Sequence, residues 1–489
     1  MTSTASSSVS ARASTKSDGK KEAKRDHLRG ITVLLFLFLA CLNVSSMASL
    51  RLALGAFAGL LLVIGLRDLR FLMLVMIALV PVQSSALGFG TVFGYQLTFN
   101  RVAVLIAVLC FLLHRSKYPR IHGRREPLLY MLLALFALSV LTDLLGDGSY
   151  LSGVQRTLSE SVEVLLFAYI CYRVFGPREL GSVTSAFATG GILLSSSVIL
   201  ERVTGMNLLF SFPVADEIYA GLLSAEQTLD RADTLRVRGS FQNPVYLSGF
   251  LPLLLFAAAY LLLVQRRRVL GGALLVLVVL TACFSISRTA IYALLIFGAP
   301  ILIMTQMRRG VGRIIRFAAL TLVLGGLLYA IFPSDLERAV TLTVNPYQAS
   351  LGGSDTADRL DLITVGVPFV LSLNPFGSGF DRSQQFSLLL GPDIADFFIG
   401  YSIARGVIWV AAFCMLLAYM MWRTLRGGNM VSWMLFWLVV SISATYLSYA
   451  EYWISFPMLL VFVLVHGGLN STSPKSQLLK RVVSVAGTQ

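Results

Sequence analysis

The sequence predicts an all-α polytopic membrane protein. Of its 489 residues, 56% are hydrophobic and only 13% are charged, which is about half the charged fraction of an ordinary soluble domain. The mean hydropathy is +0.76. Many charge-poor runs approach or exceed the ~20 residues that a helix needs to cross the hydrocarbon core of a bilayer. Together, these observations favour a bundle of membrane-spanning helices.

Apolar runs separated by polar loops predict about fourteen spans, or twelve to thirteen if the shortest runs are re-entrant or merged. The runs cover residues 31–47, 52–66, 71–87, 99–113, 128–145, 162–175, 180–200, 244–264, 269–284, 290–307, 317–332, 401–422, 430–447 and 452–465. Residues 1–30 are predicted to be a disordered basic tail, 31–466 the transmembrane domain and 467–489 a second tail. Two long polar loops, 201–243 and 333–400, interrupt the domain, and the larger one lies between the eleventh and twelfth spans.

The distribution of charge predicts the orientation of the chain. When the N-terminus is placed in the cytoplasm, most lysines and arginines fall in inner loops, as the positive-inside rule requires. Both termini are then cytoplasmic and both long loops face outward. The net charge is +15. Because the inner basic residues would lie against anionic lipid headgroups, this charge predicts no nucleic-acid partner. All basic residues on the predicted outer side are arginines. These arginines would either form salt bridges with the outer acidic residues or bind phosphate groups.

The stretch RVRGSFQNPVYLSGFL joins the first long loop to an apolar run. Asn243 is a favourable N-cap and Pro244 suits the first helical position, so a helix is predicted to begin here. Gly239 allows a turn or a close approach of a ligand. Arg236 and Arg238 precede the helix, whose N-terminal N–H groups and dipole attract anions. The alternative is a capped helix with two solvated arginines.

A second helix with the same outward-to-inward direction is predicted to begin near Thr289. Ser287 can cap it, and Arg288 lies in its first turn. Two helix N-termini on one face, each beside an arginine, would form a cradle for a lipid-linked pyrophosphate. Alternatively, Arg288 extends to the phosphates of surrounding lipids.

The larger outer loop contains a segment with helical spacing, residues 357–373, which is predicted to lie along the membrane surface or dip into it. Arg359 would occupy its first turn. After Pro375, Gly377 and Gly379 are expected to supply flexible backbone.

Two aspartates, Asp393 and Asp396, precede the next apolar run and would serve as helix caps or as a general base. All four histidines, His27, His114, His122 and His466, fall on the predicted inner side. An outer general base must therefore be Asp, Glu or Tyr. The sequence contains no GxxxxGK[ST], HExxH or CxxC pattern, so it gives no support for ATP-driven transport or for a metal site. The five cysteines are expected to be packing residues.

Three segments together resemble the O-antigen ligase/polymerase superfamily: GSFQNPVYLSGFL after an arginine, FSISRTAIYALL, and ADRLDLITVGVPFVLSLNPFGSGF. The resemblance covers roughly residues 236–406. It implies a GT-C-related fold and metal-independent, inverting transfer of a glycan from undecaprenyl pyrophosphate at the periplasmic face of the bacterial inner membrane, without a cofactor. It also implies that Arg236, Arg288 and Arg359 hold the pyrophosphate.

The sequence departs from the pattern of the superfamily at two places. Ligases that load lipid A core typically carry His-Asn where this chain has Ala395 and Asp396, and Pro-Val replaces the common Pro-Asn after Asn243. The missing histidine favours a polysaccharide polymerase that uses Asp396 or Asp393 as the base. Expected partners are undecaprenyl-pyrophosphate-linked oligosaccharides, membrane lipids, and the chain-length regulator and flippase of the same pathway. A ligase of the same superfamily and a lipid-linked glycan transporter remain the alternatives.

Overall fold

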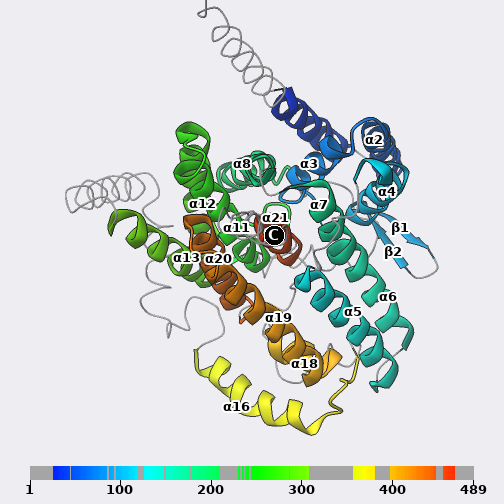
Figure 1. The fold of residues 1–489 in the computed structure, drawn as a ribbon, viewed down its shortest axis with the longest axis vertical. Helices are drawn as coiled ribbons and strands as arrows, with labels where there is room; N and C mark the ends of the chain where they lie inside the picture. Colours follow the sequence, from blue (N-terminus) through cyan, green and yellow to red (C-terminus); the bar gives the residue numbers. More distant parts are fainter. Residues whose placement is uncertain are drawn as a thin grey trace, which may run out of the picture.

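A computed structural model shows a mostly helical chain, in agreement with the predicted fold class (Figure 1). The structure describes residues 26–44, 46–84, 87–92, 95–118, 126–147, 150–176, 179–209, 230–231, 234–235, 237–241, 244–285, 287–307, 356–379, 397–447 and 455–467.

Five of the described helices are long and apolar enough to cross a bilayer. They are α2 (Met47–Arg67), α5 (Pro127–Leu145), α8 (Leu180–Thr204), α11 (Pro244–Leu263) and α19 (Val407–Leu425). Shorter apolar helices accompany them: α3 (Leu69–Leu79), α4 (Phe99–Leu113), α12 (Arg268–Phe284), α13 (Arg288–Met307), α20 (Met430–Thr445) and α21 (Phe456–Gly467). The architecture is that of an α-helical membrane protein, and the count of twelve to fourteen spans stays a prediction.

The outer helices expose apolar side chains that a soluble protein would bury. In the 18-residue apolar stretch of α2, only 28% of the residues are buried. In the corresponding stretch of α11, 83% are buried. Leu52 and Val63 of α2 and Leu133 and Leu144 of α5 are among the exposed side chains. Exposing such large apolar groups to water is unfavourable. These faces therefore fit contact with lipid, while α11 belongs to the interior.

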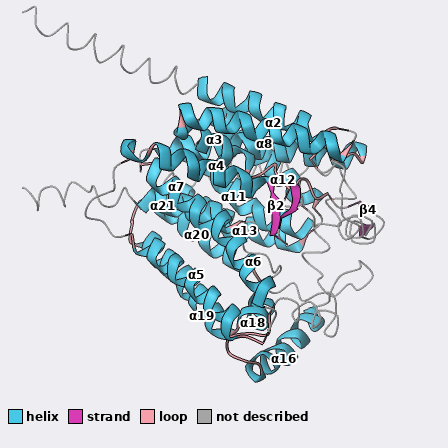
Figure 2. Cartoon of the chain, turned by 90° about the vertical axis from the view of Figure 1, so that its right-hand side faces the viewer, coloured by secondary structure: helices cyan, strands magenta, loops and turns pink. Residues whose placement is uncertain are grey.

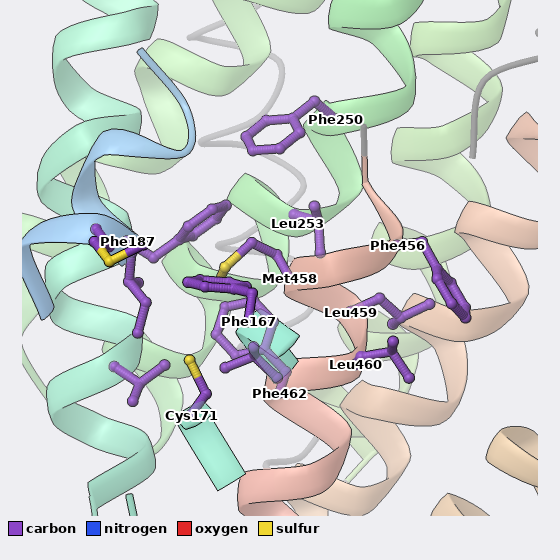
Figure 3. Close-up of a cluster of buried hydrophobic side chains, with 14 of the residues drawn as sticks. Phe167, Cys171, Phe187, Phe250, Leu253, Phe456, Met458, Leu459, Leu460 and Phe462 are labelled. Carbon is purple, nitrogen blue, oxygen red and sulfur yellow. The ribbon is translucent and has the colours of Figure 1, made fainter. Parts of the chain in front are cut away.

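Helices α11 and α21 lie at the centre of the bundle (Figure 1). Their buried side chains form an aromatic and aliphatic core. Phe462 of α21 lies 4.8 Å from Phe256 and 5.5 Å from Phe187, measured between ring centroids. Figure 3 shows Phe462 and Met458 of α21 on the side of the helix that faces Phe187 of α8, with Leu459 on the opposite side near Phe456. The side chains of α21 are buried along almost its whole length, so this helix needs no lipid-facing side.

The predicted run 71–87 forms a shorter helix than its hydropathy indicates. Helix α3 ends at Leu79, two residues before Pro81, because proline provides no backbone N–H and disfavours a helical residue before it. A hairpin follows, β1 (Gly88–Val92) paired antiparallel with β2 (Tyr95–Thr98) and irregular near Gly88. A second small pair is β3 (Asp230–Arg231) and β4 (Thr234–Leu235). The sequence patterns did not predict either hairpin.

Two further runs differ from their predicted limits. The run 162–175 belongs to a longer continuous helix, made of α6 (Tyr150–Glu160), the π-helical turn η2 (Ser161–Leu166) and α7 (Phe167–Val174). The run 401–422 is divided into α18 (Phe397–Arg405) and α19, because Gly406 between them has a φ of +84° that interrupts the helix.

The outer loop and the N-terminal region also contain helix. Helix α16 (Thr356–Ser372) occupies the segment where the sequence predicts one. Residues 26–42 are helical, so this helix begins inside the predicted tail. Figures 1 and 2 both show α16 at the lower end of the molecule beneath α18, against which it packs.

Candidate functional site

The loop that leads to α11 is fixed by a buried carboxylate. Glu201, in the last turn of α8, accepts the backbone N–H of Gly239 at 2.9 Å and that of Arg238 at 3.3 Å. Hydrogen bonds to an ionised acceptor are among the stronger ones in proteins. On the other side, the Asn207 amide donates to the Gly239 carbonyl at 2.8 Å. The backbone at residues 238 and 239 is therefore held from two directions.

Gly239 has a φ of +61°, the left-handed conformation that glycine adopts most readily. A Cβ at this position would lie 2.7 Å from Leu194 Cδ1 and 3.0 Å from Val198 Cγ2, both on α8. The next residue, Ser240, donates its hydroxyl to the Pro81 carbonyl at 2.7 Å. The turn expected at Gly239 thus packs tightly between α8 and the end of α3.

Arg238 is half-buried at this junction. Burial lowers the pKa of its guanidinium, and the neighbouring Glu201 carboxylate acts in the opposite direction. Because a guanidinium is a very weak acid, Arg238 stays cationic at neutral pH even with this lowered pKa. The loop therefore carries a positive charge close to the start of α11.

The other arginines of the predicted cradle are placed only through their helices. Arg288 is the first residue of α13, and Arg359 lies in the first turn of α16; their side chains lie outside the described part of the structure, as do Arg236 and Asn243. Pro244 is the first residue of α11, as predicted. Helices α11 and α13 pack against each other, whereas α16 packs on α18. Convergence of the guanidinium groups on one pyrophosphate stays a prediction.

The two glycines of the outer loop differ from their predicted role as flexible backbone. Gly377 and Gly379 have φ values of +87° and +85°. The backbone N–H groups of Ser378 and Gly379 donate to the carbonyls of Ile403 (2.7 Å) and Ala404 (3.0 Å). A Cβ on Gly377 would lie 2.6 Å from the Ala404 oxygen. These glycines permit close backbone packing against the end of α18, which is the opposite of flexibility.

The same loop segment is attached to the end of α5. Asn374 donates its amide to the Leu145 carbonyl at 3.2 Å, and the Asp147 N–H donates to the Gly377 carbonyl at 3.1 Å. We call residues 374–379 and 403–406 the clasp, because the two segments are joined by backbone hydrogen bonds. The clasp brings together the end of α5, the segment that follows α16 and the junction between α18 and α19.

A buried ionic network lies directly beside the clasp. Arg405, the last residue of α18, has no solvent exposure. Its guanidinium donates to Thr157 Oγ1 at 2.8 Å and to Glu160 Oε2 at 3.0 Å, and it lies 3.6 Å from Asp143 Oδ1. It also lies over the Trp409 ring, 5.6 Å from the centroid. The Arg405 network therefore joins α18 and α19 to α5 and α6.

A second arginine completes the charge balance of this network. Arg156 donates to Glu160 Oε1 at 3.2 Å and to the Tyr401 hydroxyl at 3.1 Å. Thr157 donates to Asp143 Oδ2 at 2.6 Å. Two guanidinium groups and two carboxylates are thus assembled, and their formal charges cancel. Buried charges are tolerated when they are paired and hydrogen-bonded in this manner.

A separate ion pair lies at the π-helical turn that follows α6. Arg101 Nε is 2.9 Å from Glu163 Oε1, and the Thr98 hydroxyl donates to the same oxygen at 3.3 Å. Single π-turns within helices often occur at functional sites. This pair adds the start of α4 to the set of elements that meet around α6 and η2.

The sequence patterns did not single out the Arg405 network. Residues 150–160, YLSGVQRTLSE, are too polar to be recognised as a membrane-spanning segment from hydropathy. Arg405 was counted among the arginines on the outer side but was not selected as a site residue. A search for ionisable residues beside the ends of apolar runs would have found Asp143, Glu160 and Arg405, since such residues in membrane helices are commonly functional. Their mutual contacts required the tertiary structure.

The two predicted general bases, Asp393 and Asp396, lie outside the described residues. Phe397, which begins α18, donates its N–H to the Tyr446 carbonyl at 3.0 Å and places its ring 4.5 Å from that of Tyr401. Within the described residues, no group of three or more His, Cys, Asp or Glu side chains is arranged to hold a metal. The predicted independence of the reaction from metals stays a prediction.

No protein-family model matches the sequence, and no curated protein is significantly similar to it.

Proposed function

We propose that the chain is a polysaccharide polymerase of the bacterial inner membrane. It transfers a growing glycan from undecaprenyl pyrophosphate to a hydroxyl group of the next lipid-linked repeat, at the periplasmic face. The observation that carries the proposal is the position of the three motif segments in the fold. Each places an arginine close to the N-terminus of a helix: Arg238 in the loop before α11, Arg288 as the first residue of α13 and Arg359 in the first turn of α16.

The proposed chemistry uses these positions directly. The acceptor hydroxyl oxygen attacks the anomeric carbon of the donor, the bond from that carbon to the pyrophosphate oxygen breaks, and the configuration is inverted. The hydroxyl proton passes to the carboxylate of Asp396, or alternatively of Asp393. Arg236, Arg288 and Arg359, with Arg238 beside them, stabilise the charge that develops on the pyrophosphate. The donor linkage already stores the required energy, so the reaction needs no ATP.

Backbone groups at α11 and α13 support the same assignment. The first N–H groups of a helix have no partner within it and can donate to phosphate oxygens. These two helices pack against each other, and Glu201 and Asn207 fix the loop before α11. An arrangement fixed in advance can stabilise developing charge without reorganisation during the reaction.

The test uses the purified full-length protein in liposomes with a defined undecaprenyl-pyrophosphate-linked repeat. We expect wild type to form oligomers. Arg288→Lys and Arg359→Lys should each reduce turnover by about 10- to 100-fold, because lysine lacks the two-pronged guanidinium. Arg51, an exposed arginine in α2, provides the control Arg51→Lys, which should retain full activity. Full activity of both Arg288→Lys and Arg359→Lys would contradict the phosphate role.

The proposed base is tested in the same assay. Asp396→Asn and Asp393→Asn are compared, and at least one should reduce turnover while leaving donor binding intact. If both variants polymerise normally, neither carboxylate accepts the proton. A ligase of the same type would instead transfer the glycan to a different acceptor, and cells lacking it would accumulate long unattached chains rather than single repeats on lipid.

One observation favours a lipid-linked glycan transporter as the second candidate. The sequence indicated spans that are mostly free of charge. The structure, however, buries Glu160, Glu163 and Arg405 on helices, and the side chain of Asp143 is only 6% exposed. Buried ionisable groups of this kind are common in transporters. Movement of the lipid-linked repeat across the liposome membrane, with no oligomer formed, would favour this candidate over the polymerase.

A further inference from the structure

The short helix α18 is fixed at both ends by different kinds of contact. At its start, the Phe397 N–H donates to the carbonyl of Tyr446, just after α20, and the two rings lie 5.2 Å apart. At its end, Arg405 joins the buried network and the clasp holds residues 403–406. Seven of its nine residues are buried. The chain enters this fixed helix from the residues that precede Phe397.

We propose that Arg405 is a positioning residue that fixes α18 and the clasp against α5 and α6, and thereby fixes the point from which the residues before α18 reach the reaction site. This inference rests on the proposed function, because those residues include the two candidate bases. Arg405 itself would not touch the substrate. It would determine where the carboxylate-bearing segment is anchored.

Burial and charge explain why Arg405 would hold α18 in position rather than bind an anionic substrate. Its side chain has no solvent exposure, and its guanidinium already contacts Thr157, Glu160 and Asp143 at 2.8, 3.0 and 3.6 Å. The charges in the network are balanced without a ligand. An incoming anion would have to displace two buried carboxylates. Asp143 would lose the guanidinium beside it and Glu160 would keep only Arg156 as its ionic partner, which is unfavourable for buried charges.

The shape of the guanidinium explains why arginine is needed. Nη1 donates to Thr157 and Nη2 donates to Glu160, one turn apart on α6. The planar fork therefore sets both the distance and the rotation of α18 relative to α6. A lysine ammonium is a single flexible point charge, so it could keep the ionic attraction while losing this orientation. Arg405→Lys thus separates positioning from simple charge compensation.

The first experiment measures geometry without depending on any activity. Asn374 and Asp147 contact each other at 3.3 Å across the clasp and the end of α5. We would introduce Asn374→Cys and Asp147→Cys into a full-length chain whose five cysteines are replaced by alanine, and measure the rate of disulfide cross-linking. We expect Arg405→Met to slow cross-linking at least about tenfold. An unchanged rate in Arg405→Met would overturn the proposal.

A matched control comes from a second buried ion pair elsewhere in the bundle. Arg423 of α19 bonds to Glu126 at the start of α5, and both side chains are largely buried. Arg423→Met removes one partner of a comparable pair, so it tests the general effect of destabilising α19. Cross-linking should remain within about twofold of its normal rate in this variant. An equal loss in both variants would show that general destabilisation, not Arg405, governs the clasp.

The second experiment measures turnover of the lipid-linked repeat. A positioning role predicts that Arg405→Lys lowers kcat roughly 100-fold, since a displacement of about 1 Å can have that effect, while KM for the donor changes less than about threefold. Arg405→Met/Glu160→Met removes one charge of each sign and leaves Asp143 and Arg156 balanced. It should recover thermal stability but not kcat. Recovery of both would show a purely structural role and overturn the proposal.

The role of Arg405 can be tested even if the proposed polymerase function is wrong. If wild type forms no oligomer from any lipid-linked repeat, the polymerase assignment fails, whereas the cross-linking rates still decide whether Arg405 fixes the clasp. If Arg405→Met does not fold, Glu160→Gln retains an acceptor and the size of the side chain while removing the charge. This variant should also slow cross-linking, and a normal rate would contradict the proposal.

Discussion

Replacing Gly406 by alanine should open the clasp. Gly406 has φ +84° and ψ +160°, a region that is essentially accessible only to glycine and costs other residues about 1–3 kcal/mol. An added Cβ would also lie 2.6 Å from Gly377 N and from the Phe376 carbonyl carbon, and closer still to the Pro375 oxygen. Because these are backbone atoms, no rotation of a side chain can relieve the contacts.

The magnitude follows from the hydrogen bonds that must lengthen when the two segments separate. Overpacking of a tight contact typically costs 1–3 kcal/mol. The bonds from Ser378 N to Ile403 O and from Gly379 N to Ala404 O, at 2.7 and 3.0 Å, contribute about 0.5–1.5 kcal/mol each. Since these contributions overlap, we expect Gly406→Ala to lower the free energy of unfolding by about 3–5 kcal/mol in total.

A matched control separates backbone strain from crowding. Gly428 has φ +62°, and no atom outside the adjacent residues lies within 4 Å of the Cβ that alanine would add. Gly428→Ala should therefore cost only about 1–2 kcal/mol, the penalty of a left-handed backbone. Both variants are compared with wild type by denaturant titration in detergent micelles, followed by tryptophan fluorescence. A loss in Gly406→Ala no larger than that in Gly428→Ala would refute the reasoning.

Three other substitutions test the remaining contacts by the same titration. Glu201→Gln removes the charge that holds the Gly239 loop and should cost about 1–2 kcal/mol; no loss would show that the charge is unimportant there. Trp409→Phe removes the 2.7 Å bond to the Ser139 hydroxyl and should cost about 1–3 kcal/mol, whereas equal stability would contradict a stabilising bond. Arg423→Met leaves Glu126 buried without its partner and should cost about 3–5 kcal/mol. Adding Glu126→Met should restore most of that loss, and the absence of recovery would argue against the ion pair as the cause.

Local signals in the sequence were sufficient for several elements. Asn243-Pro244 predicted the start of α11, Ser287-Arg288 predicted that of α13, and helical spacing predicted α16. These predictions succeeded because a helix start depends on a few adjacent residues, and an apolar run depends only on composition. The same local signals failed at α3, where Pro81 shortened a run that hydropathy had extended to residue 87.

The division of residues 397–425 into two helices was not visible in the sequence. Glycine is common within membrane helices, so Gly406 gave no signal by itself. Its positive φ depends on residues 374–379, about thirty positions earlier in the chain, which pack against it. The roles of Gly377 and Gly379 were misjudged for the same reason, since a glycine in a loop suggests flexibility until its packing partner is known.

The sequence by itself determined that this protein is a helical membrane protein and where several of its helices begin, because hydrophobicity and capping act over short distances along the chain. Only the tertiary structure showed that Arg405 of α18 is bonded to Thr157 and Glu160 of α6 and lies beside Asp143 of α5. Ionic partners 245 residues apart, as Arg405 and Glu160 are, leave no pattern in a single sequence. Their pairing depends on three-dimensional proximity and on the high free energy of leaving a buried charge without a partner.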